Sequence, residues 1–141
     1  MSFFGEYRHT IDAKGRLIVP SRIRDALGGD TAVLVRYMDN CIAVFSQEGF
    51  ETFRGQLLAQ PKSNEDARKL IRTLGAGTHV DLIDKQGRIN VPQKLRDHAG
   101  IDKEVVVVGA IDHAEIWEPQ QWAANELDQD GLNERAGGLS F

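Results

Sequence analysis

Two short stretches of the chain combine a carboxylate, a glycine and an arginine at the same spacing. They are Asp12-Ala13-Lys14-Gly15-Arg16 and Asp84-Lys85-Gln86-Gly87-Arg88. An arginine guanidinium can meet a phosphate or a guanine through two parallel hydrogen bonds, and a carboxylate paired with it fixes its rotamer beforehand. The chemistry that suits these residues is therefore recognition of a nucleic acid by side chains held ready for contact.

Each stretch also has the composition of a tight hairpin. A three-residue hairpin connection is usually a type I turn followed by one residue in the left-handed region, which is where Gly15 and Gly87 stand. Asp12 occupies the first turn position, where its carboxylate can accept hydrogen bonds from loop amides, and Arg16 restarts the strand nearly opposite. A single Asp-x-x-Gly-Arg is most often only a stable turn with a weak surface ion pair. Its occurrence twice, in basic surroundings, favours a binding role.

Positive charge is concentrated around both stretches, although the net charge of the chain is −4. Residues 6–24 hold five Lys or Arg against two acids, residues 84–96 hold four against one, and residues 112–141 hold one against seven. Because the local potential steers a charged partner, the net charge does not exclude a polyanion. The residues expected to support the hairpins are Arg8, Arg22 and Arg24 around the first, and Lys94 and Arg96 around the second. Lys85, within the second hairpin, is itself expected to contact the nucleic acid.

Both stretches belong to an internal repeat with an offset of 72 residues. The identical pairs include Asp12/Asp84, Gly15/Gly87, Arg16/Arg88, Val19/Val91, Pro20/Pro92, Arg24/Arg96, Asp25/Asp97, Gly28/Gly100, Val33/Val105 and Val35/Val107. So many matches in one ungapped register indicate a duplicated unit of roughly 45 residues. We expect one unit at 5–47, linking helices at 48–75, a second unit at 76–119, and a C-terminal helix with a loose acidic tail at 120–141.

Each unit is expected to begin with a hairpin and to continue with a short helix and two further strands. The expected strands are residues 6–11, 16–19, 31–35 and 41–45 in the first unit, and 78–83, 88–91, 104–108 and 114–118 in the second. Pro20 and Pro92 should open the helices, since proline has no amide hydrogen to lose at the first helical position. Gly28 and Gly100 should end them, since glycine accepts the left-handed conformation.

Two amphipathic helices are expected between the units. The first ends before Pro61, and the second begins at Asn64, a good N-cap residue. The apolar faces expected for them are Phe50, Phe53, Leu57 and Leu58 in the first, and Ala67, Leu70, Ile71 and Leu74 in the second.

Composition and the remaining motifs argue against other classes of protein. Hydrophobic residues make up 41% and charged residues 27%, as in a soluble globular domain, and no apolar run is long enough for a membrane span. The single cysteine, Cys41, is expected to be a packed thiol, which favours a reducing, cytoplasmic location. The four histidines neither repeat nor show metal spacing, and no nucleophile pattern accompanies them. We therefore expect no enzyme, metal site, cofactor or small-molecule substrate.

The pattern Asp-x-Lys-Gly-Arg-x-x-Val-Pro, duplicated on either side of a helix pair, resembles that of the MraZ family of bacterial transcriptional regulators. The resemblance runs from about Gly5 to Trp122. It implies an α+β, mostly β fold, in which each of two tandem βαβ-type units resembles an AbrB-type swapped-hairpin DNA-binding domain. The two units would then interlock into one pseudo-symmetric β-barrel, with the linking helices attached.

The resemblance also implies site residues and partners. The DNA-contacting motif of the family falls on Asp12, Lys14, Gly15 and Arg16, and on Asp84, Gly87 and Arg88. The position that matches Lys14 is Gln86, and the second hairpin carries its lysine at Lys85 instead, so the two hairpins are not equivalent. The family forms rings and binds short direct repeats upstream of the division and cell-wall gene cluster that contains its own gene. That implies double-stranded promoter DNA and further copies of the chain as partners, and a location on the nucleoid.

Two functions remain open from the sequence. The first is a sequence-specific DNA-binding transcriptional regulator. The alternative is an oligomeric scaffold that binds another protein through the same basic hairpins. Affinity for DNA that falls steeply as salt rises would favour the first, because neutralising phosphates releases counterions.

Overall fold

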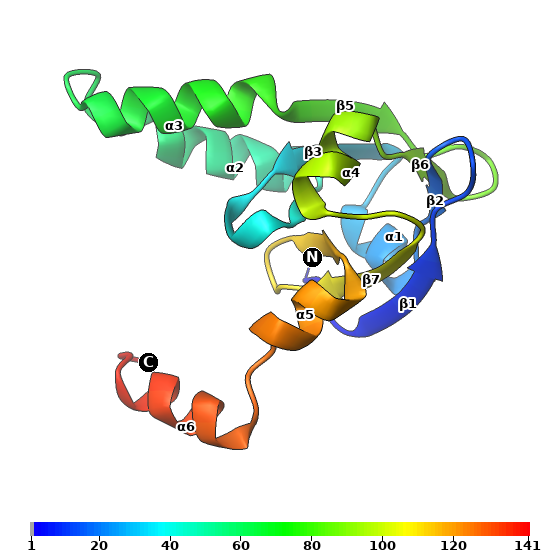
Figure 1. Ribbon diagram of the computed structural model, residues 1–141. Coiled ribbons are helices and arrows are strands. Elements are labelled where there is room, and N and C mark those ends of the chain that lie inside the picture. The colour runs from blue at the N-terminus through cyan, green and yellow to red at the C-terminus, as the bar shows by residue number, and fades with distance from the viewer. Residues whose placement is uncertain (1) are drawn as a thin grey trace.

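The computed structural model describes residues 2–141 as a β-rich body from which two helices project on one side (Figure 1). The strands are β1 Glu6–Thr10, β2 Arg16–Ile18, β3 Thr31–Arg36, β4 Ile42–Phe45, β5 Thr78–Leu82, β6 Arg88–Asn90, β7 Glu104–Gly109 and β8 Ala114–Trp117. The helices are α1 Ser21–Leu27, α2 Gln47–Leu58, α3 Glu65–Ala76, α4 Gln93–Ala99, α5 Pro119–Asn125 and α6 Gln129–Gly137, with a short 3-10 turn at Met38–Asn40. The fold is mixed α/β, and strands outnumber α-helices among these residues, as expected.

The strands pair across the two halves of the repeat. One antiparallel sheet has the order β1-β7-β8-β4-β3-β5, and a second sheet contains only β2 and β6. The first strand of each copy therefore lies beside the third strand of the other, as β1 with β7 and β5 with β3. The β2–β6 and β4–β8 pairs each join equivalent strands. The two copies of the repeat are therefore related by an approximate two-fold axis in the structure.

The six-stranded sheet is open. Its edge strands are β1 and β5, and no pairing between them closes the sheet among residues 2–141. The closed barrel implied by the family resemblance is therefore not formed by these pairings. The ends of the two first strands lead instead into the small β2–β6 sheet, which begins where Ile11 bridges to Leu17.

One hydrophobic core serves both halves. Its largest cluster takes buried side chains from each copy, among them Leu17, Leu34, Ile89 and Val107. A second cluster lies beneath α2 and contains Phe45 with the partly buried Phe50. The corresponding aromatic residues of the second copy, Trp117 and Trp122, pack in the same way in a third cluster beside α5. These four aromatic residues thus pack in or against the core, with Phe50 and Trp122 partly exposed.

The short helices begin differently from the expectation. Pro20 and Pro92 are N-cap residues with extended ψ angles of 140° and 150°, not the first helical residues. The carbonyl of Pro20 accepts the first helical hydrogen bond, from Arg24 N at 2.9 Å. The two helices end where expected, at Gly28 and Gly100, which adopt left-handed φ angles of 70° and 66°.

The linking helices α2 and α3 form a hairpin that projects from the sheet (Figure 1). Asn64 caps α3 as expected, with its side chain accepting a hydrogen bond from Ala67 N. The apolar faces are only partly used: Phe50, Phe53 and Leu57 contact the core, whereas Leu58 and Leu70 are exposed. Leu58 was thus wrongly expected to pack with its neighbours, because it is turned away from Leu57 by about 100° around the helix.

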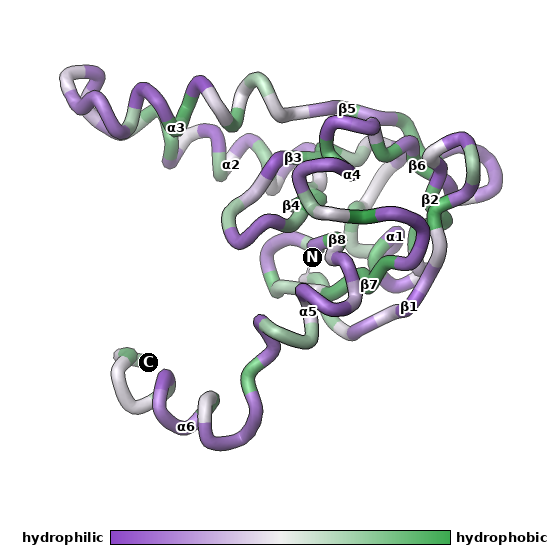
Figure 2. The backbone as a smooth tube through the Cα atoms, in the orientation of Figure 1, coloured by the Kyte–Doolittle hydropathy of each residue, from purple (hydrophilic) through white to green (hydrophobic). Residues whose placement is uncertain are grey.

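The C-terminal segment is more regular than expected. Residues that were expected to form a loose tail contain α6, which Asp128 caps by accepting from Gly131 N at 2.7 Å. Figure 2 shows α6 as a largely hydrophilic helix set apart from the body, reached by a connection after α5. None of the helices found in residues 2–141 is both long enough and apolar enough to traverse a lipid bilayer.

Candidate nucleic-acid interface

The first hairpin turn is organised around the carboxylate of Asp12. Its Oδ1 accepts hydrogen bonds from the backbone amides of Lys14 and Arg16, both at 2.9 Å, and its Oδ2 accepts from Arg16 Nε at 3.0 Å. Gly15 adopts a φ angle of 81°, in the left-handed region. The turn and the ion pair expected from the sequence are therefore both present. The Nε of Arg16 donates to Asp12. The two terminal nitrogens of the Arg16 guanidinium have no hydrogen-bond partner within residues 2–141.

The second turn repeats this geometry and adds one contact. Asp84 accepts from the amides of Gln86 and Arg88 at 2.9 Å and from Arg88 Nε at 2.8 Å, and Gly87 has a φ angle of 79°. In addition, Arg88 Nη2 donates to Gln86 Oε1 at 3.2 Å. The departure from the family pattern at Gln86 therefore leaves Arg88 fewer free donors than Arg16 has.

The two aspartates are held in the charged form. Hydrogen bonds from the backbone amide and the side chain of Arg16 lower the pKa of the Asp12 carboxyl below its ordinary 3.8. Arg88 lowers the pKa of Asp84 in the same way. Because the charged carboxylate accepts these bonds, both turns keep their ion pairs throughout the neutral and mildly acidic range.

The arginines of both turns lie on one face of the β2–β6 pair. In this antiparallel pair Arg16 is opposite Asn90, and Ile18 is opposite Arg88. Opposite residues share a face, so these four side chains stand on the outer side, while Leu17 and Ile89 face the core. We call the face formed by Arg16, Ile18, Arg88 and Asn90 the ribbon face. Arg16 and Arg88 therefore project from a common side of the ribbon.

The turns are also tied to each other. Gly15 O accepts from Val91 N, and Gly87 O accepts from Val19 N, both at 2.8 Å. An added Cβ at Gly15 would lie 3.0 Å from Nη2 of Arg96, and one at Gly87 would lie 2.9 Å from Nη1 of Arg24. Each of these helix arginines therefore reaches beneath the turn of the opposite copy. Sequence reasoning counted them only as supporting charge, because it could not place them across the repeat.

This packing gives a prediction for Gly15→Ala. Both Gly15 and Gly28 have left-handed φ angles, so alanine at either position adds backbone strain of about 1–2 kcal/mol. At Gly15 the new methyl group would also meet Arg96 and lie 3.2 Å from Val91 O, whereas at Gly28 nothing lies within 4 Å. Urea unfolding should show the larger loss of stability for Gly15→Ala. Equal losses for the two variants would contradict the cross-packing.

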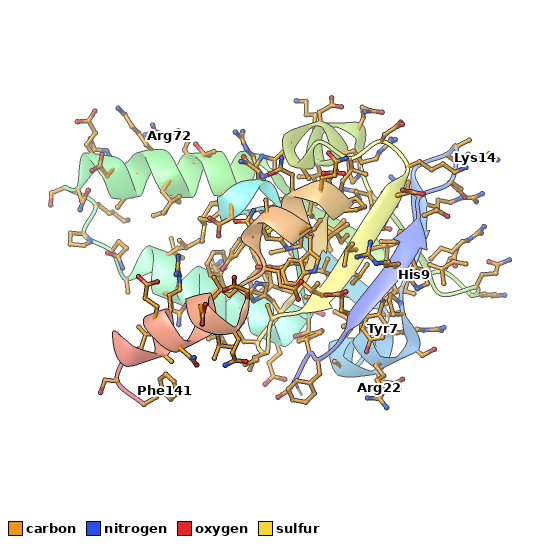
Figure 3. The ribbon with its side chains drawn as sticks, turned by 60° about the horizontal axis from the view of Figure 1, so that its bottom comes forward. Tyr7, His9, Lys14, Arg22, Arg72 and Phe141 are labelled. Atoms are coloured by element: carbon orange, nitrogen blue, oxygen red, sulfur yellow. The ribbon has the colours of Figure 1, made fainter. Side chains whose placement is uncertain are left out.

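The other basic residues expected near the turns are not all placed there. Lys14 lies at the outermost point of the first turn, whereas Arg22 projects from α1 well away from it (Figure 3). Lys85 lies in the second turn, Arg8 is on the edge strand β1, and Lys94 is on α4. Arg72, on α3, lies at the far end of the molecule from Lys14 (Figure 3). The structure thus brings together the two turns, the ribbon face, Arg24 and Arg96, with Arg22 outside this group.

A second cluster of titratable groups joins the buried His113 to the exposed Asp112 and the largely buried Glu115. His113 Nδ1 contacts Asp112 Oδ1 at 2.6 Å, and its Nε2 contacts Glu115 Oε2 at 2.9 Å. Burial lowers the pKa of His113, but the bonds to the two carboxylates outweigh it and raise the pKa overall. The ring also stacks on Phe45, so the cluster ties the β7–β8 turn to the core. Burial raises the pKa of the Cys41 thiol, which keeps it protonated, as expected of a packed cysteine.

Comparison with known proteins gives the affiliation of the chain. The model of the MraZ protein family, described as antitoxin-like, matches residues 2–73 and again residues 74–133. The chain belongs to the MraZ family. The two matches correspond to the two copies of the repeat, each with its own Asp-x-x-Gly-Arg turn.

Curated MraZ relatives cover most of the chain. A protein named transcriptional regulator MraZ from Lachnoclostridium phytofermentans is 47% identical over 126 residues, which is 89% of this chain and 88% of the relative. A protein of the same name from Ligilactobacillus salivarius is 47% identical over 86% of this chain and 85% of its own length. A solved structure, the solution structure of PHS018 from Pyrococcus horikoshii, aligns over 82% of this chain and 89% of its own at 19% identity, with a TM-score of 0.34. That score is too low to bear on the fold.

Proposed function

We propose that this MraZ protein is a sequence-specific DNA-binding regulator of transcription. The observation that carries the proposal is the ribbon face, where two arginines from equivalent turns stand diagonally across from each other on one accessible surface. Their side chains are 34% and 25% exposed, and each is already oriented by an aspartate. An arginine held in this way loses little conformational freedom when it binds a phosphate or a guanine.

Positive charge around the turns supports contact with the DNA backbone. Lys14 and Lys85 extend the turns, and Arg24 and Arg96 place two further guanidinium groups directly beneath them. Phosphate contacts of this kind give affinity and orientation, while contacts to base edges give specificity. Residues 112–141, outside this group, hold seven acids against one arginine, so the net charge of −4 does not oppose binding at the ribbon face.

The exchange of first strands supports a relationship to swapped-hairpin DNA-binding units. In this proposal, 5–47 and 76–119 are AbrB-like units, each lending its hairpin to the sheet of the other, with 48–75 linking them and 120–141 following. Pairing of β1 with β7 and of β5 with β3 is what such an exchange requires. The exchange sets the two turns together on one side, which neither unit could do alone.

Assembly of several copies into a ring would multiply weak contacts to repeated sites. Two separate apolar surfaces support head-to-tail contact: Leu58, Leu70, Val80 and Leu82 are exposed along α2, α3 and β5, and Phe4 and Ile111 are exposed elsewhere. Contact between unlike surfaces closes into a ring when the rotation between subunits permits it. The family resemblance implies the same assembly.

The resemblance also supplies the proposed target. It implies short direct repeats in the promoter upstream of the cell-division and cell-wall gene cluster that includes the gene of this protein, and hence a cytoplasmic protein bound to the nucleoid. Neighbouring subunits would meet repeats spaced by about one helical turn, ~10 base pairs.

A footprint on the DNA upstream of the gene tests the proposal directly. We expect protected segments at a regular spacing, with affinity that falls steeply between low and moderate salt. A probe with a single repeat should bind more weakly than one with three. Absence of any protection, or affinity that does not change with salt, would favour the alternative of a protein-binding scaffold.

A further inference from the structure

The ribbon face is not symmetric in its residues. The approximate two-fold axis exchanges β2 and β6, so it relates Arg16 to Arg88 and Ile18 to Asn90. The cross-strand pairs on this face are therefore Arg16 with Asn90 and Arg88 with Ile18. A symmetric ribbon would carry two identical pairs, whereas here one arginine stands beside an amide and the other beside an aliphatic side chain.

Ile18 and Asn90, the two residues of the ribbon face that differ between the halves, are both exposed. Ile18 is 53% exposed although its strand neighbour Leu17 is buried, and Asn90 is also exposed. The backbone amide of Asn90 donates to Asp81 Oδ2 at 2.6 Å, which fixes the strand there. Its side-chain amide makes no hydrogen bond within residues 2–141. One donor–acceptor group and one apolar group are thus presented between two oriented guanidinium groups.

These two side chains suit different base edges. An asparagine amide can form two hydrogen bonds with N6 and N7 of adenine in the major groove, and an aliphatic side chain fits the methyl group of thymine. The major groove admits a two-stranded β-ribbon. We propose that Asn90 and Ile18 are the specificity-determining residues of the ribbon face, with Asn90 selecting adenine and Ile18 selecting thymine next to the positions met by the arginines. This inference rests on the proposed DNA-binding function.

The same asymmetry determines whether the DNA sequence that the protein binds is a palindrome. A two-fold protein reads a palindrome because its two halves make equal contacts. Here one half offers Arg16 with Asn90 and Lys14, and the other offers Arg88 with Ile18 and Gln86, whose side chain is bound to Arg88. One protomer therefore reads a non-palindromic sequence, and a single orientation on the duplex is preferred.

The experiment compares base preference among matched variants of the full-length protein. Binding sites are selected from randomised duplex DNA by the wild type, by Ile18→Asn, which makes the two halves alike on this face, and by Asn90→Ala. Leu132→Asn is the control, because Leu132 is exposed on α6, outside the ribbon face and outside the surfaces proposed for subunit contact. Circular dichroism and light scattering confirm that each variant keeps its fold and its mass.

We expect a non-palindromic site for the wild type and for Leu132→Asn. Ile18→Asn should lose the thymine preference and select a more symmetric site, and Asn90→Ala should lose preference for adenine at one position by about fivefold or more. Binding to non-specific DNA should be unchanged in all three. If the wild type binds DNA but Ile18→Asn and Asn90→Ala select the same sites as it does, or if Ile18→Asn changes only the assembly mass, this inference is wrong while the proposed function stands. If the wild type binds no DNA, both fail.

Discussion

Arg16→Ala is expected to weaken binding to promoter DNA by about ten- to a hundredfold, because a well-oriented arginine contact contributes roughly 1–3 kcal/mol. The terminal nitrogens of Arg16 have no partner among residues 2–141, so the variant removes groups that only a ligand can engage. Asp12 keeps its bonds to the backbone amides of Lys14 and Arg16, so the turn itself should survive. Fluorescence anisotropy measures the affinity, and light scattering should show an unchanged assembly mass.

Two further variants sharpen this test. Arg88→Ala should cost less than Arg16→Ala, since Arg88 already donates one terminal nitrogen to Gln86. Arg54→Ala is the matched control, because this arginine is 57% exposed on α2, away from the ribbon face. An equal loss for Arg54→Ala and Arg16→Ala would mean that overall charge, not the oriented turn, binds DNA.

Leu17→Ala is expected to lower the free energy of unfolding by about 2–5 kcal/mol, as for other leucines removed from tightly packed cores. Leu17 is 1% exposed and lies opposite Ile89 beneath the ribbon face. A loss of this size is a large share of the total stability of a small protein, about 5–15 kcal/mol. Urea unfolding measures the loss, and DNA affinity should fall with it as the ribbon loses its support.

Ile18→Ala is the control for that experiment. Ile18 is the next residue on the same strand but stands on the outer side, so its loss should change stability by about 0.5 kcal/mol or less. A comparable loss at both positions would show that β2 does not have one buried side and one accessible side.

Much of this structure could be predicted from the sequence because the chain repeats itself. Glycine at the fourth position of each turn, with aspartate at the first, specifies a local conformation that needs no tertiary contact, and both turns formed as expected. The strands and short helices followed for the same reason, since alternation, Gly28 and Gly100 are local signals. The pairing of Asp12 with Arg16 and of Asp84 with Arg88 also followed from spacing alone.

What escaped prediction depends on contacts between distant segments. Arg24 and Arg96 have no local sign that they reach beneath the opposite turn, because that requires knowing which strands exchange. Ile18 and Asn90 could have been noticed, since the 72-residue alignment pairs them and finds them different. The width of the covered side of α2 could not be predicted either, so Leu58 was expected to pack, although only Leu57 beside it contacts the core.

The exchange of first strands has a consequence for synthesis of the chain on the ribosome. Glu6 pairs with Val108, about a hundred residues later, so β1 has no partner until most of the chain has emerged. At about 5–20 residues per second, this strand stays without its native neighbour for roughly 5–20 seconds. The nascent first half therefore lacks part of its sheet throughout that interval, until β7 and then β8 emerge to pair with β1 and β4.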